Sequence, residues 1–402
     1  MANTARSPSR LPLIVIGAGC LVLIVSMGAR TSFGLFLQPV STDLGWGREV
    51  FAFGIALQNL IWGAAQPFAG AIADKFGSGR TIAGGVLLCA IGTILMSQTS
   101  APLEFHVSTG LLVGLGLSGS GIAVVLSAMT RTVPEEKRSM VFGIGTAAAS
   151  MGQFLMVPLG QAFLDAYGWS TALLLLGLMT LAVAPLAAAL TGRPQSAAGM
   201  PEQSLKLALA EAGRHRGYWL LIAGFFVCGF HVAFIAAHLP AYIVDRGQLP
   251  GLAATALALV GLFNIVGSYT AGVLGGKLSK KYRLSFLYTA RSVVILVFIS
   301  VPMTQTSVLI FAAAMGLLWL STVPLTSGLV AQIFGPRYMA TLFGIVFFSH
   351  QVGSFLGVWL GGRLFDATGS YDVVWWLGVA LGVISALLHW PIDERSVRLA
   401  RA

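Results

Sequence analysis

Two arginines lie inside long apolar stretches of this chain, where a permanent positive charge is costly. Arg30 falls in the stretch 11–37 and Arg291 in the stretch 284–303. Arginine cannot lose its proton in a protein, and its planar fork of N–H donors matches a carboxylate. The acids nearest to mid-depth stand at the edges of such stretches and are Glu104, Asp165 and Asp366. The spacing therefore predicts that both arginines attract an anionic ligand, the alternative for each being a side chain that snorkels to the headgroups.

Two histidines, like the two arginines, lie inside long apolar stretches, and histidine changes its charge near neutral pH. A shift of 201 residues places His231 on the position of Arg30, so the two are predicted to face one cavity from equivalent helices. His350 lies deep in the stretch 339–365. Both histidines are predicted to contact the anion or to carry a proton. The alternative is that each simply hydrogen-bonds a neighbouring helix.

Uncharged polar side chains in other apolar stretches complete the predicted binding set. They are Asn59, Asn264 and Ser120. Amides and hydroxyls in such positions also join helices to one another, and this reading stays open for each of them. The three cysteines show no metal-ligand spacing, and the histidines show no HxxxH spacing, so we expect no metal site and no cofactor.

The elements that must position these residues follow from composition. Only 9% of the 402 residues are charged and 56% are apolar, which excludes a soluble globular domain and a disordered chain. The sequence contains twelve apolar stretches that are long enough to cross a bilayer. Their predicted ranges are 11–37, 50–73, 81–98, 105–130, 139–164, 170–191, 217–243, 251–275, 284–303, 307–332, 339–365 and 371–391.

The basic residues indicate how these spans are oriented. The outward loops hold three of the 24 Lys and Arg, namely Arg48, Arg246 and Arg363, and two more lie within spans. All others fall on the side of the termini, which predicts that both termini are cytoplasmic. The net charge of +10 is thus spread over loops rather than clustered on one face, and a nucleic-acid partner is not expected.

The second half of the chain repeats the first at a constant offset of 201 residues. Among the coinciding pairs are Gly28 with Gly229 and Gly152 with Gly353. Two six-helix halves related by an axis along the membrane normal are a transporter plan, with the substrate bound where the halves meet. The predicted domains are 1–192 and 217–402, joined by a cytoplasmic linker at 193–216.

One loop carries a recognisable motif. It reads Gly70-Ala-Ile-Ala-Asp74-Lys75-Phe-Gly77-Ser-Gly-Arg80 and resembles the GxxxDxxGxR signature of the major facilitator superfamily, with Arg80 one residue further from Gly77 than in that signature. The resemblance implies the twelve-helix fold of that family and a cytoplasmic latch formed by Asp74 and Arg80. The ends of spans one and eleven are similar to those of bacterial monocarboxylate porters and oxalate/formate antiporters. The eighth span, however, has Asn264 and Ser268 where monocarboxylate porters carry Asp and Arg.

Together these features predict an all-α membrane protein with two pseudo-symmetric six-helix halves. We expect a monomeric secondary transporter in the cytoplasmic (inner) membrane, not an enzyme, that moves a small mono- or dicarboxylate by alternating access. It would be proton-coupled or an anion exchanger. The alternative is an efflux transporter for apolar or cationic compounds, which would be expected to show a buried acid.

Overall fold

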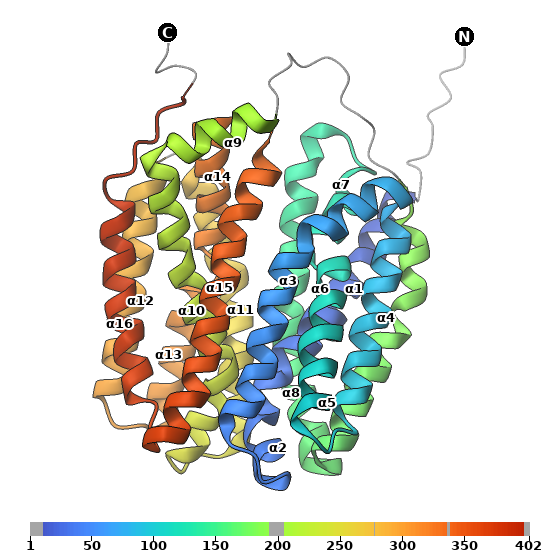
Figure 1. Cartoon of the computed structure of the whole chain (residues 1–402), viewed down its shortest axis with the longest axis vertical. Coiled ribbons are helices and arrows are strands. Elements are labelled where there is room, and N and C mark those ends of the chain that lie inside the picture. Colours follow the sequence, from blue (N-terminus) through green and yellow to red (C-terminus); the bar gives the residue numbers. More distant parts are fainter. Residues whose placement is uncertain (1–10, 193–204, 277, 336–337, 398–402) are drawn as a thin grey trace.

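The computed structural model describes residues 11–192, 205–276, 278–335 and 338–397. Its helices form two bundles side by side, the first in blue to green and the second in yellow-green to red in Figure 1. The first bundle contains α1 (Leu11–Thr31), η1 (Ser32–Phe36), α2 (Leu37–Asp43), α3 (Arg48–Phe76), α4 (Ser78–Met96), α5 (Pro102–Phe105), η2 (His106–Leu112), α6 (Val113–Ser120), α7 (Ile122–Thr130), α8 (Glu135–Ala182) and η3 (Ala184–Leu190). The second contains α9 (Leu205–Arg214), α10 (Arg216–Asp245), α11 (Pro250–Gly275), α12 (Lys280–Ser300), α13 (Gln305–Leu318), α14 (Thr322–Phe334), α15 (Met339–Thr368) and α16 (Asp372–His389).

The twelve predicted spans are found in these helices. Ten helical stretches are long and apolar enough to cross a membrane by length and composition. One of them, Met140–Leu190, holds two spans, because Gly168 takes a left-handed φ of 76° and turns the chain back within α8. α3 adds the twelfth: it has 29 residues, but three amides lower its hydropathy.

Two predicted spans are discontinuous, which the sequence reading did not foresee. The span 105–130 breaks at Gly121, whose extended backbone (ψ 175°) separates α6 from α7. The span 307–332 breaks between Leu318 and Thr322, where α13 ends and α14 begins. Broken helices at membrane depth need other groups to satisfy the freed backbone atoms. The polar linker differs too: Leu205–Arg214 forms helix α9, whereas 193–204 lie outside the described residues.

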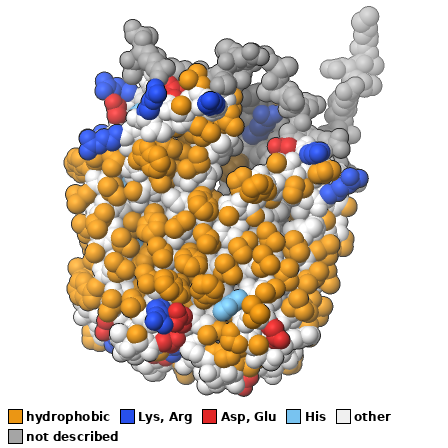
Figure 2. All heavy atoms as spheres, in the orientation of Figure 1, with side chains coloured by type: hydrophobic (Ala, Val, Ile, Leu, Met, Phe, Trp, Pro, Cys, Tyr) orange, Lys and Arg blue, Asp and Glu red, His pale blue; other side chains and the backbone are white. Residues whose placement is uncertain are grey.

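The surface matches a bilayer environment. Large apolar side chains are exposed on most helices, and Figure 2 shows them covering the middle of the molecule, with charged groups gathered at its two ends. We call the end that holds Leu11 and α9 the terminal end, and the end that holds the turns after α2 and α15 the far end (Figure 1). This multi-pass arrangement leaves the buried polar groups inside the bundles or between them.

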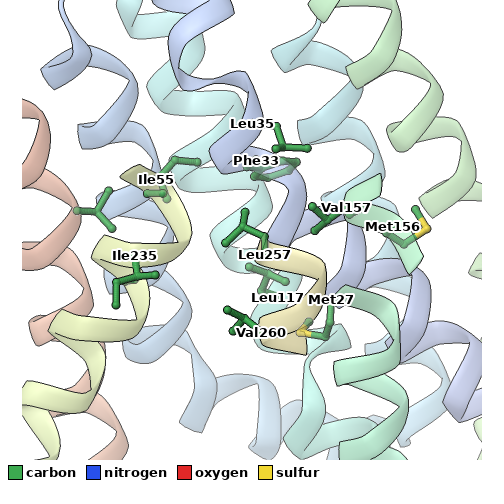
Figure 3. Packing of buried hydrophobic residues seen from close by; sticks show 14 of the residues in the cluster. Met27, Phe33, Leu35, Ile55, Leu117, Met156, Val157, Ile235, Leu257 and Val260 are labelled. Carbon is green, nitrogen blue, oxygen red and sulfur yellow. The ribbon is translucent and has the colours of Figure 1, made fainter. Parts of the chain in front are cut away.

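The apolar core joins the bundles unevenly. One cluster of buried residues draws on both bundles, and Figure 3 shows Ile55 and Val157 of the first beside Ile235 and Leu257 of the second. The other cluster consists only of residues between 212 and 392, in the second bundle. In Figure 2 a recess separates the bundles at the terminal end. The bundles are therefore closed together toward the far end and parted toward the terminal end.

Repeated glycines bring helices into close contact inside each bundle. A Cβ on Gly152 would overlap the carbonyl of Ile24 on α1, and one on Gly353 would overlap the carbonyl of Phe226 on α10. Small residues at such crossings let backbones approach in membrane proteins. The glycine pairs that coincide at an offset of 201 thus mark the same contact in both bundles.

We expect Gly353→Ala to destabilise the protein, because the added methyl group meets a backbone atom that cannot move aside. Overpacking of this kind costs about 1–3 kcal/mol. Gly344→Ala on the same helix is the matched control, because a Cβ there has no neighbour within 4 Å. The thermal unfolding midpoint in detergent should fall for the first variant and stay or rise slightly for the second. Equal midpoints would contradict the close contact.

Candidate functional site

Arg30 lies where α1 ends and the chain tightens into the 3₁₀ helix η1. Its Nη2 donates to Oδ1 of Asn59 at 2.5 Å, and its guanidinium lies over the ring of Trp62, with Cζ 5.0 Å from the ring centre. Asn59 is itself held by donating to the carbonyl of Ile55 at 2.8 Å. Arg30 and Asn59, both members of the predicted binding set, are therefore in direct contact, one on α1 and the other on α3.

The guanidinium of Arg30 keeps unused donors. Nε has no hydrogen-bond partner, Nη1 donates to no described residue, and the side chain is partly exposed. None of the ion pairs among the described residues includes it. Arg30 is partly exposed midway along the stretch Pro12–Asp43, a depth at which contact with lipid would leave its charge unsolvated.

Trp62 places Arg30 at the boundary between the bundles, and sequence reasoning missed it. The Trp62 ring meets Phe347 of α15 edge-on at 5.7 Å, and Phe347 stacks on His350 with an interplanar angle of 9°. Trp62 follows Asn59 by three residues and so shares its helical face, which is the signal that could have identified it. A chain of contacts thus runs from Arg30 in the first bundle to His350 in the second.

His350 is almost fully buried on α15. Its Nδ1 is 3.1 Å from Oε1 of Gln351 and 3.5 Å from Oγ of Ser354. Its ring also lies 5.0 Å from that of Phe225 on α10. The ring of Phe347 therefore separates His350 from Trp62 and from the boundary between the bundles.

His231 lies elsewhere than the repeat suggested. Its Nε2 is 2.7 Å from the carbonyl of Gly378 on α16, the side chain is 1% exposed, and Nδ1 has no partner. Among the described residues, no hydrogen bond or ring contact joins His231 to Arg30. The pairing of the two across one cavity stays a prediction that these contacts do not support.

Arg291 is enclosed in the second bundle and does not snorkel. Its Nε and Nη2 donate to the carbonyl of Leu318 at 3.1 and 2.6 Å, and Nη2 also donates to the carbonyl of Trp319. These are backbone groups freed at the break after α13, and a cation at a helix C-terminus is favoured by the helix dipole. The contacts assign Arg291 to the broken helix rather than to the boundary between the bundles.

The remaining predicted residues divide between the boundary and the bundle interior. Asn264 bridges the bundles: its Nδ2 donates to Oγ of Ser150 on α8 at 2.9 Å, and its Oδ1 accepts from the backbone N–H of Leu320 at 2.9 Å. Ser120 is fully buried in the first bundle, where its hydroxyl donates to the carbonyl of Gly116, one turn back on the same helix α6. Its Oγ also lies 3.8 Å from Sγ of Cys89 on α4, so its contacts stay within the first bundle.

At the far end a polar network clamps the two bundles together. Nη1 and Nη2 of Arg48 donate to the carboxylate of Asp245 at 2.6 and 2.7 Å, and the guanidinium lies 3.8 Å over the ring of Phe365. The backbone N–H groups of Arg48 and Glu49 donate to Asp366 at 2.9 and 2.8 Å, so this carboxylate caps the N-terminus of α3. The sequence analysis used Arg48 only as a basic residue of an outward loop. Its partners are about 200 to 320 residues away in the sequence, so the network could not be recognised there.

The predicted latch residues lie at the terminal end, where the bundles are parted. Asp74 and Arg80 are both exposed, and no ion pair within the described residues joins either of them to a partner. Arg131 donates to Ser78 at 2.5 Å, and its partial burial lowers its pKa while Asp74 nearby raises it. The latch stays a prediction for another conformation of the chain.

Comparisons with known proteins agree with this geometry. A family model described as Major Facilitator Superfamily matches residues 19–358. Monocarboxylate transporter 13 of Rattus norvegicus is 27% identical over 90% of this chain and 86% of the relative, and the uncharacterized MFS-type transporter YcxA of Bacillus subtilis is 25% identical over 90% of each.

Solved structures show the same fold. A bacterial homologue of the human lysosomal transporter Spinster, in an inward-facing and occupied conformation, superposes with a TM-score of 0.75 at 14% identity and covers 98% of this chain and 99% of that one. The D-xylose–proton symporter superposes with a TM-score of 0.72 at 13% identity, covering 96% and 99%.

Proposed function

We propose that this chain, which belongs to the Major Facilitator Superfamily and is therefore a multi-pass membrane transporter rather than an enzyme, carries a small organic anion by alternating access. The single observation that carries the proposal is the guanidinium of Arg30. It is a permanent cation at the boundary between the bundles, oriented by Asn59 and Trp62, with unused donors and no carboxylate partner within the described part of the chain.

The contacts favour a substrate with one carboxylate group over a substrate with two. Arg30 offers the cation at the boundary, whereas the donors of Arg291 are turned to the carbonyls of Leu318 and Trp319. The rings of Trp62 and Phe347 border the same place and suit an apolar body attached to the carboxylate. We therefore favour a monocarboxylate over a dicarboxylate, which is also what the names of several relatives at 24–27% identity indicate for those proteins.

The proposed cycle starts from the conformation described above. With the termini placed in the cytoplasm, as the basic loops predict, the recess opens to the cytoplasm and the network around Arg48 closes the far end. Binding at Arg30 neutralises the charge at the boundary, after which the bundles can rock and open the far end. A proton could accompany the anion on His350, which is linked to Arg30 through Trp62 and Phe347.

Counterflow into proteoliposomes tests the proposal. Proteoliposomes that contain the purified protein and are loaded with unlabelled lactate should accumulate labelled lactate. They should accumulate labelled oxalate more weakly and should not accumulate an organic cation of similar size. Accumulation of the cation alone would establish the alternative of cation export. Accumulation of oxalate above lactate would overturn the preference for one carboxylate.

A further inference from the structure

Gln351 on α15 has a buried amide of which only one end is satisfied. Its side chain is 1% exposed, and Nε2 has no hydrogen-bond partner among the described residues. The other end is held within the second bundle, where Oε1 is 3.1 Å from Nδ1 of His350 and 3.5 Å from Oγ of Ser354. An amide oxygen only accepts, so these contacts orient the amide and leave its N–H groups free. A buried donor without an acceptor is unfavourable and needs a specific explanation.

The free amide lies at the boundary between the bundles, where α15 crosses α3. A Cβ on Gly63 of α3 would stand 2.7 Å from both Cβ and Cγ of Gln351, so the two helices touch at this point. Gly63 follows Trp62 directly and follows Asn59 by four residues. These two side chains hold the guanidinium of Arg30. Gln351 is therefore a polar residue of the second bundle that packs against the segment of α3 that positions Arg30.

The internal repeat shows what is missing at this crossing. The offset of 201 residues relates Gly63 to Asn264, and it relates Ser150 to Gln351. At the corresponding crossing of α11 with α8, Nδ2 of Asn264 donates to Oγ of Ser150 across the boundary at 2.9 Å. The amide donor there has an acceptor on the opposite bundle, whereas the amide of Gln351 meets a glycine, which offers no side chain. The acceptor for Nε2 then has to come from a bound molecule.

A carboxylate is the acceptor that suits the free donors of this region. Nε of Arg30 and Nε2 of Gln351 both lack a partner among the described residues, and a carboxylate accepts hydrogen bonds at both of its oxygens. An ammonium group has no acceptor to offer. Because the two donors belong to different bundles, an anion that both of them hold joins the bundles to one another.

We infer that Gln351 is a substrate-binding residue, whose Nε2 donates to the carboxylate held by Arg30 when the two bundles close around the substrate. Nε2 is shielded from solvent in the conformation described, so the bond forms only after the bundles have moved. The bond stabilises the closed conformation over the open one, and binding of the anion thereby favours the transport step. The inference rests on the proposed transport of an anion and identifies the partner that the second bundle contributes.

Gln351→Met tests the inference, because it removes the amide with little change in volume. Lactate binding to the purified full-length protein should weaken about 10-fold in isothermal calorimetry, since a hydrogen bond to a charged group is lost. Counterflow at saturating lactate should also slow, since the closed conformation loses a contact. Ser354→Ala is the matched control on the same helix: it removes the neighbour 3.5 Å from Oε1 and leaves Nε2 in place, so both readouts should stay at the parent values. Undiminished lactate affinity in Gln351→Met would overturn the inference.

Gln351→Glu gives a readout that a purely structural role would not give, and it decides the question where Gln351→Met does not fold. It keeps an oxygen toward His350 and replaces the N–H donors by a titratable oxygen. At about pH 8 the added carboxyl is ionised and should repel lactate, whereas toward about pH 5.5 it takes up a proton and regains a donor. Lactate affinity relative to the parent protein at the same pH should therefore be low at the higher pH and recover at the lower. Affinity equal to that of the parent at both pH values would overturn the inference.

Failure of the inference and failure of the proposed function give different results. Lactate binding that depends on Arg30 but not on Gln351 would overturn the inference and leave the proposed function intact. A parent protein that neither binds lactate nor accumulates labelled lactate would overturn the proposed function, and the inference with it.

Discussion

Replacement of Arg30 by alanine is expected to abolish counterflow of labelled lactate and to weaken lactate binding by about 10- to 100-fold. The change removes the cation at the boundary between the bundles, and hydrogen bonds to a charged group contribute about 1.5–3 kcal/mol. Binding to detergent-solubilised protein, followed by isothermal calorimetry, measures the affinity directly. The same variants in proteoliposomes measure transport.

Three further variants separate charge, geometry and fold. Arg30→Lys should retain part of the affinity, because it keeps the charge and loses the planar fork. Asn59→Leu should weaken binding less than Arg30→Ala, since it removes only the group that orients the guanidinium. Arg246→Gln is the matched control, because this exposed arginine pairs with Asp372 at the far end, 3.6 Å away. Undiminished binding in Arg30→Ala would rule out Arg30 as the carboxylate site.

Breaking the far-end network is expected to shift the protein toward a conformation open at that end. Arg48→Gln removes a two-pronged ion pair whose side chains are 12% and 25% exposed, and Asp366→Asn weakens the cap on α3. A loss of about 1–2 kcal/mol raises the population of the open form about 5- to 30-fold. We expect this shift to change the transport rate, because alternating access needs the network to form and to break in each cycle.

Accessibility of an introduced cysteine measures the shift. Ile55→Cys lies about two turns from Arg48 along α3, toward the middle of the molecule, and Ile55 is buried against the second bundle (Figure 3). A membrane-impermeant maleimide added at the far end should label it several-fold faster in Arg48→Gln, with the labelled position identified by mass spectrometry. Arg363→Gln, which breaks the exposed pair with Glu49, should change the rate little. Equal labelling in Arg48→Gln and the parent protein would refute the clamp.

The glycine contacts illustrate how far sequence reasoning reached. The offset of 201 residues matched Gly28 with Gly229 and Gly152 with Gly353, and each pair occupies the same kind of helix crossing in its bundle. The twelve spans and their ends follow from hydropathy and from single residues such as Gly168. In a bilayer the positions of the spans depend on the composition along the chain, so they can be predicted from the sequence alone.

The sequence proposed a set of site residues but not their contacts. Arg30 and Asn59 both belong to the predicted binding set, and their contact was not foreseen. His231 and Ser120 were assigned to a binding set, yet His231 bonds to α16 of its own bundle and Ser120 bonds to the preceding turn of its own helix. A polar residue in an apolar span signals that a partner exists, but the direction of its side chain depends on how the helix is rotated against its neighbours.

The sequence by itself determined that this is a twelve-helix membrane transporter and that two arginines lie inside its spans without an acid. Only the tertiary structure decided what each arginine does, because the deciding atoms come from distant parts of the chain. Arg30 has Trp62 and the boundary between the bundles beside it, whereas Arg291 donates to the carbonyls of a broken helix. Hydropathy fixes the depth of a charge in the membrane, but the groups that surround it depend on packing.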